Sequence, residues 1–178
     1  MTILAIDPGP MSVTFWVPGI PKPGGSKRGF VNRKTGRVII TEDCKASKDW
    51  RISVAFAAAR AIPRLFPGPL RVTFTFFLPR PHGHYGAGAR AFFLRASAPD
   101  YPAVRPDITK LIRSTEDALK GIAWQDDSQI VQQVASKQYG VHGMPAGAQI
   151  TIAPAGPALE PAVASRGLFA EQEEDLQR

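Results

Sequence analysis

The strongest periodic signal in the chain is an amphipathic helix that begins at Pro106 and ends near Gly121. Six side chains fall within one arc of about 100° on a helical wheel: Ile108, Leu111, Ile112, Thr115, Leu119 and Ile122. Mostly charged side chains lie off this arc, at Lys110, Arg113, Ser114, Asp117 and Lys120. A proline at the first turn and a glycine after the last are typical helix boundaries. The chain must therefore bury one face of this helix against other elements.

Alternation of apolar and polar residues predicts strands over 13–17 and 70–78, each stopped by proline. A second helix is expected over 45–62, a short strand over 38–40, and two closing strands over 128–138 and 148–153. Residues 19–37 and 80–105 are predicted to be loops. This pattern indicates an α/β (α+β) fold, a single compact domain with a small mixed β-sheet packed by two main helices.

The 178 residues suffice for one domain, expected over 11–154, with an N-terminal appendage at 1–10 and a flexible acidic tail at 155–178. Lysine and arginine number 22 against 15 aspartates and glutamates, a formal charge of +7. The tail holds five of the acids and two of the bases, so the rest of the chain carries 20 − 10 = +10. An excess of this size favours a polyanionic partner, nucleic acid first.

Composition excludes several other classes of protein. One cysteine, Cys44, and three histidines are too few for a disulfide scaffold or a cysteine-based zinc finger. The sequence shows no secretory signal pattern and no apolar run of about 18 residues, so no membrane partner and a cytoplasmic location are expected. A hydrophobic content of 44% is that of a folding chain rather than a disordered one.

Carboxylates cluster in one part of this basic chain. Five of the ten acids outside the tail lie within 21 residues: Asp107, Glu116, Asp117, Asp126 and Asp127. Carboxylate oxygens are the ligands of Mg²⁺ and Mn²⁺, the hard cations that assist phosphodiester hydrolysis. A helix of about 18 Å followed by an extended return of about 20 Å could bring Asp127 back beside Asp107. The alternative, equally weighted on spacing, is that Asp107 only caps the helix and Asp126 and Asp127 only form a turn.

The stretch Arg105 to Ile130, RPDITKLIRSTEDALKGIAWQDDSQI, resembles the signature of the RusA-type Holliday junction resolvases, roughly PD-x-D-N-L-x-K-x3-D-A-L-x-G-x4-D-D-x-Q. The similarity continues upstream in Trp16 to Lys22, WVPGIPK, and covers about 13–153. The resemblance implies an intertwined α/β homodimer that binds four-way branched DNA. It further implies symmetric, Mg²⁺-dependent nicking of opposed strands in recombination and repair.

Carried over by position, the resemblance makes Asp107 and Asp127 catalytic and metal-binding residues, with Asp126 as a further metal ligand. Arg113 stands where the family usually has a functional lysine. An arginine keeps the positive charge but does not give up a proton, so its expected role is electrostatic.

Thr109 is the main departure from the signature, because the family has its second aspartate there. A threonine hydroxyl is a weak metal ligand. Either Asp126, Asp117 or a water molecule completes the metal shell in its place, or the metal site is weakened. The alternative function is accordingly a catalytically weakened or inactive homologue that binds branched DNA.

Six basic residues are candidate DNA contacts, with a solvated hairpin loop as the alternative for most of them. They are Lys22, Lys27, Arg28, Arg33, Lys34 and Lys110. Phe30 is a candidate stacking residue among them. His82 and His84 lie in a glycine-rich loop, for which a surface or DNA-contact role is favoured over a metal site.

Asp7 follows an apolar run, as the metal-binding aspartate does in the RuvC-like fold, but nothing after it follows that pattern and this interpretation is set aside. Trp50 and Trp124 are predicted to pack in the core. Glu116 is predicted to lie on a solvated face, and Asp117 is predicted to form an ion pair with Lys110 or Arg113.

Overall fold

The computed structural model describes residues 12–24, 27–42, 46–140 and 145–156. The predicted appendage at 1–10, with Asp7, and nearly all of the predicted tail lie outside these residues. Among the described residues, no helix is long and apolar enough to cross a membrane.

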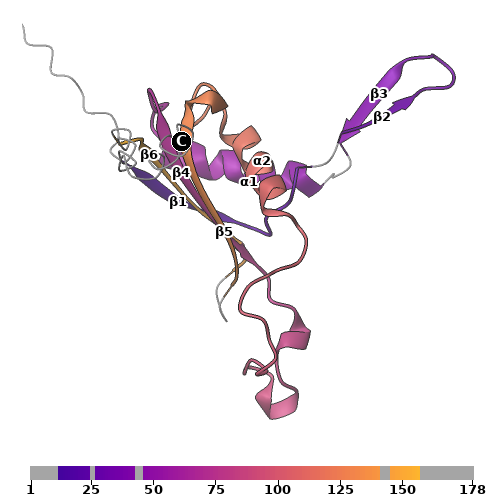
Figure 1. Cartoon of the computed structure of the whole chain (residues 1–178), viewed down its shortest axis with the longest axis vertical. Helices are drawn as coiled ribbons and strands as arrows, with labels where there is room; N and C mark the ends of the chain where they lie inside the picture. The colour runs from indigo at the N-terminus through magenta and orange to yellow at the C-terminus, as the bar shows by residue number, and fades with distance from the viewer. Residues whose placement is uncertain (1–11, 25–26, 43–45, 141–144, 157–178) are drawn as a thin grey trace, which may run out of the picture.

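Four strands form one mixed sheet: β1 (Val13–Pro18), β4 (Leu70–Leu78), β5 (Ile130–Tyr139) and β6 (Gly147–Pro154). Their order is β1-β6-β4-β5, with β6 antiparallel to both neighbours and β5 parallel to β4. The strand β5 thus lies at one edge (Figure 1). The parallel pairing of β4 and β5 follows from the crossover through α2 (Ile108–Leu119), which returns the chain to the same end of the sheet. These elements confirm the predicted α+β fold.

Two helices, α1 (Ala46–Ala61) and α2, cover one face of this sheet (Figure 1). Alternate side chains of β4, at Val72, Phe74 and Phe76, are fully buried beneath them. Trp50 and Trp124 are also in the core, as predicted. The indole N–H of Trp50 donates to the Thr115 hydroxyl at 3.1 Å, which explains why a threonine sits on the apolar arc of α2.

The face of α2 that is buried in the structure differs from the apolar arc predicted by the helical wheel. Ser114 is fully buried and Ala118 nearly so, while Ile108 and Ile112 are only partly covered. Gly24 explains the difference, because its N–H donates to the Lys110 carbonyl at 2.9 Å and a Cβ added at this glycine would lie 3.7 Å from the Ser114 Cβ. The segment after β1 therefore docks on α2, a tertiary contact that the helical period alone does not predict.

The predicted loop over 19–37 contains a strand. β2 (Lys27–Val31) pairs antiparallel with β3 (Val38–Glu42), which lengthens the predicted strand at 38–40, and the hairpin projects from the body (Figure 1). Its turn is built by Asn32, whose side chain accepts from the Lys34 N–H, and by Gly36 at φ 65°. Because this segment is rich in glycine and basic residues, the alternation of apolar and polar residues in β2 is too short to predict a strand.

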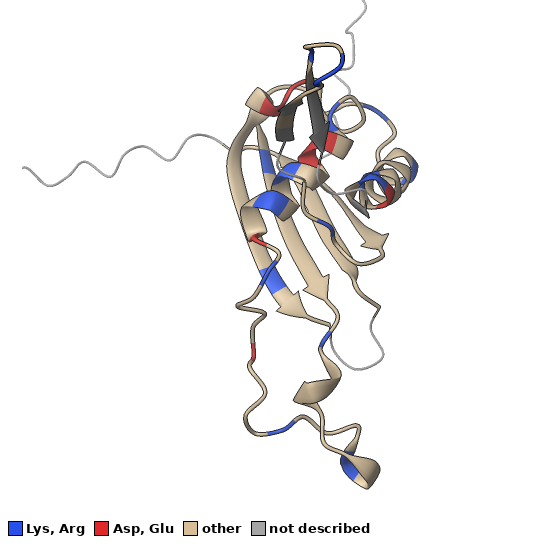
Figure 2. Ribbon diagram, turned by 90° about the vertical axis from the view of Figure 1, so that its right-hand side faces the viewer, with Lys and Arg blue, Asp and Glu red and all other residues tan. Residues whose placement is uncertain are grey.

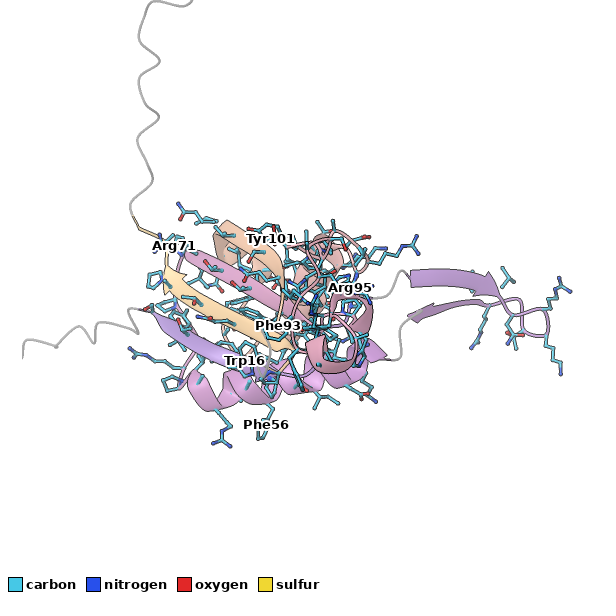
Figure 3. The ribbon with its side chains drawn as sticks, turned by 90° about the horizontal axis from the view of Figure 1, so that it is seen from below. Trp16, Phe56, Arg71, Phe93, Arg95 and Tyr101 are labelled. Atoms are coloured by element: carbon cyan, nitrogen blue, oxygen red, sulfur yellow. The ribbon has the colours of Figure 1, made fainter. Side chains whose placement is uncertain are left out.

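Residues 79–106, here called the arm, project from the end of the sheet (Figure 1). Figure 3 views the molecule from the side of the arm and labels Phe93, Arg95 and Tyr101 on it. The arm contains two 3₁₀ turns, η1 (His82–His84) and η2 (Gly88–Arg90), and is folded back on itself. Its two limbs are joined by Arg95, which donates from Nε to the Tyr85 carbonyl at 2.7 Å, and by the Gly86 N–H bonded to the Phe93 carbonyl. The predicted long loop is therefore a structured segment that is held together by its own hydrogen bonds.

Candidate functional site

Asp107 occupies the N-cap of α2 immediately after the arm. Its carbonyl accepts the first helical N–H groups, from Lys110 and Leu111, but its carboxylate makes no capping hydrogen bond. The carboxylate instead lies 3.4 Å from the Lys110 ammonium, and both side chains are about half exposed. The structure thus favours a role for this carboxylate beyond capping.

A cleft of about 770 Å³ opens beside Asp107. Its walls come from the segment after β1, the ends of β4 and β5, and both ends of the arm: Ile20, Pro21, Lys22, Pro23, Leu78, Pro79, Pro81, Pro102, Val104, Arg105, Pro106, Asp107, Lys110 and Tyr139. Three cationic side chains, Lys22, Arg105 and Lys110, line it beside one carboxylate. A largely apolar cleft with three cations and one acid suits a phosphate group attached to an organic body.

Lys137 and Tyr139 fix the position of the cleft on the sheet. The ammonium of Lys137, on β5, donates to the Val104 carbonyl at 2.8 Å and to the Pro106 carbonyl at 2.9 Å. The Arg80 guanidinium lies 4.3 Å from the ring centroid of Tyr139 and donates to the Pro99 carbonyl. The two side chains anchor both limbs of the arm. The sequence signal for this role is a lone lysine in the otherwise uncharged strand β5, and periodicity and motif spacing do not single it out.

Asp126 and Asp127 lie at the other end of α2. Gly121, at φ 79°, turns the chain after the helix, and the buried Trp124 holds this turn against the core. The Trp124 indole N–H donates to the Asp127 carboxylate at 2.8 Å. The Asp126 side chain caps the 3₁₀ turn η3 (Asp127–Gln129) by accepting from the Ser128 N–H. A compact turn therefore replaces the extended return considered from the sequence.

Ion pairs and burial shift the pKa values at this end of α2. A hydrogen bond of 2.6 Å from the Lys120 ammonium, supported by the Ser128 N–H, lowers the pKa of Asp126 well below its usual range. The same pair raises the pKa of Lys120. Burial raises the pKa of Glu116, as do the charges of Asp127 and Asp117, against a hydrogen bond from Gln133. The prediction of a solvated Glu116 is thus wrong, because the residue is half-buried against β5.

The predicted carboxylate site is not assembled within one chain. Asp107 begins α2, whereas Asp126 and Asp127 pack beyond its end, about 20 Å away along the axis at 1.5 Å per residue. Within the part of the chain that the structure describes, no three acidic, histidine or cysteine side chains form a metal-binding group. The expectation that Asp127 returns beside Asp107 is therefore wrong for a single subunit.

The remaining predicted residues divide among three places. Thr109 and Arg113 are exposed one helical turn apart on α2, and Lys22 and Lys110 line the cleft. Lys27 and Arg28 lie in β2 and Arg33 and Lys34 in the hairpin turn, where both are exposed (Figure 2). The side chains of Lys27, Arg28 and Phe30 lie outside the described residues. Asp117 pairs at 3.9 Å with Arg51, not with the predicted Lys110 or Arg113.

Comparison with known proteins agrees with the sequence resemblance. A family model described as endodeoxyribonuclease RusA matches residues 18–153. The uncharacterized protein YqaN of Bacillus subtilis (strain 168) is 28% identical over 133 residues, which cover 71% of this chain and 87% of that protein. The family match includes the cleft, α2 and the turn that carries Asp126 and Asp127. The chain therefore belongs to the RusA endodeoxyribonuclease family, which supports a nuclease.

Proposed function

We propose that this protein is a structure-specific endonuclease that cuts four-way (Holliday) junctions by phosphodiester hydrolysis, with Mg²⁺ or Mn²⁺ as cofactor. The observation that carries the proposal is the cleft at the start of α2, where a carboxylate without a capping role lies among Lys22, Arg105 and Lys110. Family membership supports the nuclease part of the proposal. The proposed substrate is branched DNA, and the proposed processes are DNA recombination and repair.

The cations of the cleft supply the electrostatic part of the reaction. Three positive side chains attract a backbone phosphate, and the N–H groups at the start of α2 favour negative charge at the same end. Arg113, one turn further along the exposed side of α2, is proposed to offset the charge that develops during hydrolysis. The hairpin β2–β3 extends the basic surface away from the cleft, where it can follow a DNA arm.

The residues of one chain do not fit a Mg²⁺ ion shared by the predicted carboxylates. Mg²⁺ takes oxygen ligands at about 2.0–2.1 Å, so two carboxylates that share it lie within a few ångströms of each other. Asp107 and Asp127 lie at opposite ends of α2, and Asp126 is paired with Lys120. No catalytic step through such an ion follows from one subunit.

A branched-DNA-binding protein without nuclease activity is the second candidate. The threonine at position 109 favours it, because this residue replaces an expected carboxylate on the exposed start of α2. The basic cleft and hairpin would serve binding equally well in either case.

A cleavage assay on a four-way junction and on linear duplex DNA, with Mg²⁺ or Mn²⁺, separates the two candidates. We expect metal-dependent nicking of the junction and little cleavage of the duplex. Asp107→Asn and Asp127→Asn are each expected to reduce nicking by about 100-fold or more while junction binding is retained. Tight junction binding without nicking would leave the binding function, and nicking unaffected by both substitutions would contradict the site assignment.

A further inference from the structure

The arm presents most of the exposed aromatic surface of the described residues. Four phenylalanine, tyrosine or tryptophan side chains in this part of the chain are more than half exposed, and three of them lie on the arm: Phe92 at 72%, Phe93 at 68% and Tyr101 at 70%. The fourth, Phe56, is 65% exposed on α1. Leu94 follows the phenylalanine pair and is 52% exposed. Three consecutive large apolar side chains at a surface are typical of a binding site.

The tip of the arm, residues 86–93, is a loop whose backbone is already formed. The Gly86 N–H donates to the Phe93 carbonyl at 2.9 Å, and the next pair outward joins the Arg95 N–H to the His84 carbonyl at 2.9 Å. Within the loop, the Phe93 N–H donates to the Arg90 carbonyl at 3.0 Å. Only glycine fits at position 86, because a Cβ there would lie 2.5 Å from the Arg90 carbonyl oxygen. Such a loop loses less conformational entropy when its side chains bind a partner.

Charge favours nucleic acid as the partner of this surface. The arm carries four arginines and one acidic residue, Asp100, a balance of +3. Arg90 and Arg95 are exposed on either side of the phenylalanine pair. Arginines suit backbone phosphates, and aromatic rings suit bases, because every base has a π-face. A protein partner would need acidic groups beside its apolar surface, whereas DNA with unstacked bases offers both kinds of contact.

We propose that the tip of the arm stacks Phe92 and Phe93 on unstacked bases at the branch point of a DNA junction. Bases inside a linear duplex are covered on both faces, so the two rings find a partner where the stack is interrupted. The arm would then distinguish branched DNA from linear duplex, which the cations of the cleft do not, because both forms carry phosphates. The identity of this substrate rests on the proposed function, whereas binding without metal ion tests the stacking independently.

The arm joins this tip to the cleft beside Asp107. Both of its ends line the cleft, through Pro81 on the outgoing limb and Val104 on the returning limb (Figure 1). The tip begins at Gly86, five residues after Pro81, so it lies within about 17 Å of the cleft wall at about 3.4 Å per residue. DNA rises about 3.4 Å per base step, so this distance corresponds to about five steps. A base at the tip and a phosphate in the cleft can therefore belong to the same branch point.

The affinities for a four-way junction and for a linear duplex, measured without metal ion, test the proposal. We expect the double variant Phe92→Ala, Phe93→Ala to raise the Kd of the junction by about 10-fold or more and that of the duplex by less than about twofold. The variant Phe92→Leu, Phe93→Leu keeps apolar side chains without rings and should show most of the same loss.

An exposed ring on another element provides the control. Phe56 is 65% exposed on α1, and the Arg60 guanidinium lies 5.7 Å from its ring centroid, so it also combines a ring with an arginine. Phe56→Ala should leave the Kd of the junction and that of the duplex unchanged.

A fluorescent base at the branch point reports the stacking itself. The adenine analogue 2-aminopurine is quenched by neighbouring bases, so wild type should increase its fluorescence when it withdraws this base from the stack. Phe56→Ala should give the same increase, and the double alanine variant at saturating concentration should not.

Four results would overturn the proposal. They are wild-type junction affinity in the double alanine variant, an equal loss of affinity for junction and duplex, full junction binding by the leucine variant, and a changed oligomeric state of the DNA-free alanine variant in sedimentation. The last would assign the rings to a protein contact. Failure of the proposed function gives a different result: wild type would bind the junction through the two rings without nicking it in Mg²⁺ or Mn²⁺, and the role of the arm would stand.

Discussion

Position 109 carries the departure from the family signature that bears most directly on catalysis. Thr109 is exposed in the first turn of α2, two residues after Asp107 and one turn before Arg113. A carboxylate there would lie on the same end of the helix as the cleft, where a hydroxyl offers a weaker ligand to a hard cation. The local backbone is regular helix, so a substitution at this exposed position needs no rearrangement of the core.

We predict that Thr109→Asp raises the rate of metal-dependent junction nicking by about 10-fold, if a missing ligand limits the reaction. Single-turnover nicking at saturating protein measures the effect apart from DNA binding. Thr109→Asn is the matched control, because it keeps the size of the side chain without the charge. Equal rates for the two variants would mean that the carboxylate is not what position 109 lacks.

Partial burial of the Glu116 carboxylate is expected to lower the free energy of unfolding at neutral pH. Its pKa is raised, chiefly by burial, so its ionised form is less favourable in the folded than in the unfolded chain. The penalty is absent below the ordinary pKa of 4.5, grows as the pH rises from 4.5 to the folded pKa, and is fully present above the folded pKa. Glu116→Gln is therefore expected to increase the free energy of unfolding at pH 7, by less than about 1 kcal/mol for a half-exposed group.

Denaturant unfolding at pH 7 and near pH 3.5 measures this difference. The gain from Glu116→Gln should be present at pH 7 and vanish at the lower pH, where both side chains are neutral. The Gln133 side chain can donate to either residue, so the hydrogen bond is conserved. A variant that is less stable at pH 7 would show that the charge of Glu116 is compensated in the folded protein.

The turn of the hairpin β2–β3 is expected to contribute to DNA affinity through the charges of Arg33 and Lys34. Arg33 and Lys34 are exposed in its turn and make no ion pair that would hold them against the body among the described contacts. Each contact with a phosphate contributes about 0.9 to the slope of log K against log salt. We predict that Arg33→Ala and Lys34→Ala each reduce the slope by about one, measured by titration of a four-way junction at several salt concentrations.

A lysine of similar exposure on another element provides the control for the hairpin. Lys48 lies exposed in the first turn of α1, outside the hairpin. Lys48→Ala should leave the salt slope within error of wild type. An equal reduction from all three substitutions would indicate nonspecific attraction by net charge rather than contacts made by the hairpin.

The arm depends on β5 for its position. Because Lys137 bonds to two carbonyls at the end of the arm, Lys137→Met removes both bonds while it keeps most of the aliphatic length. We predict a loss of about 1 kcal/mol in stability and faster tryptic cleavage after Arg90 and Arg95, which are followed by alanines. Limited proteolysis followed by mass spectrometry measures the cleavage, with Lys48→Met as the control. Unchanged cleavage after both arginines would show that other contacts hold the arm.

At the scale of the whole molecule, net charge is divided between a basic body and an acidic C-terminal segment. Residues 157–178 contain five acids and two bases, so their removal raises the formal charge from +7 to +10. We predict that a chain ending at Gly156 binds DNA more tightly at low salt, because less of the basic field is offset. The difference from the full chain should shrink above about 0.15 M salt as screening increases. An unchanged affinity at low salt would mean that these residues lie far from the bound DNA.

Local pattern was sufficient for most elements of this chain. The period of α2, the alternation in β4 and the prolines after β1, α1 and β4 depend only on neighbouring residues, and the structure confirms the elements that they predict. The strand β2 was missed because its alternation is short and interrupted by Gly29. The burial of Ser114 was missed because it depends on Gly24, ninety residues earlier, which docks on α2.

The sequence by itself determined the fold class, the core and the chemistry that the chain can offer, because periodicity and residue type express local preferences. Only the tertiary structure decided which chemical groups meet. The indole of Trp124 is buried, so the turn that carries Asp127 stays beside the end of α2, while Lys137 holds Asp107 near the far end of β5. Spacing along a chain limits how far two carboxylates can be apart, but packing of the residues between them decides whether they meet.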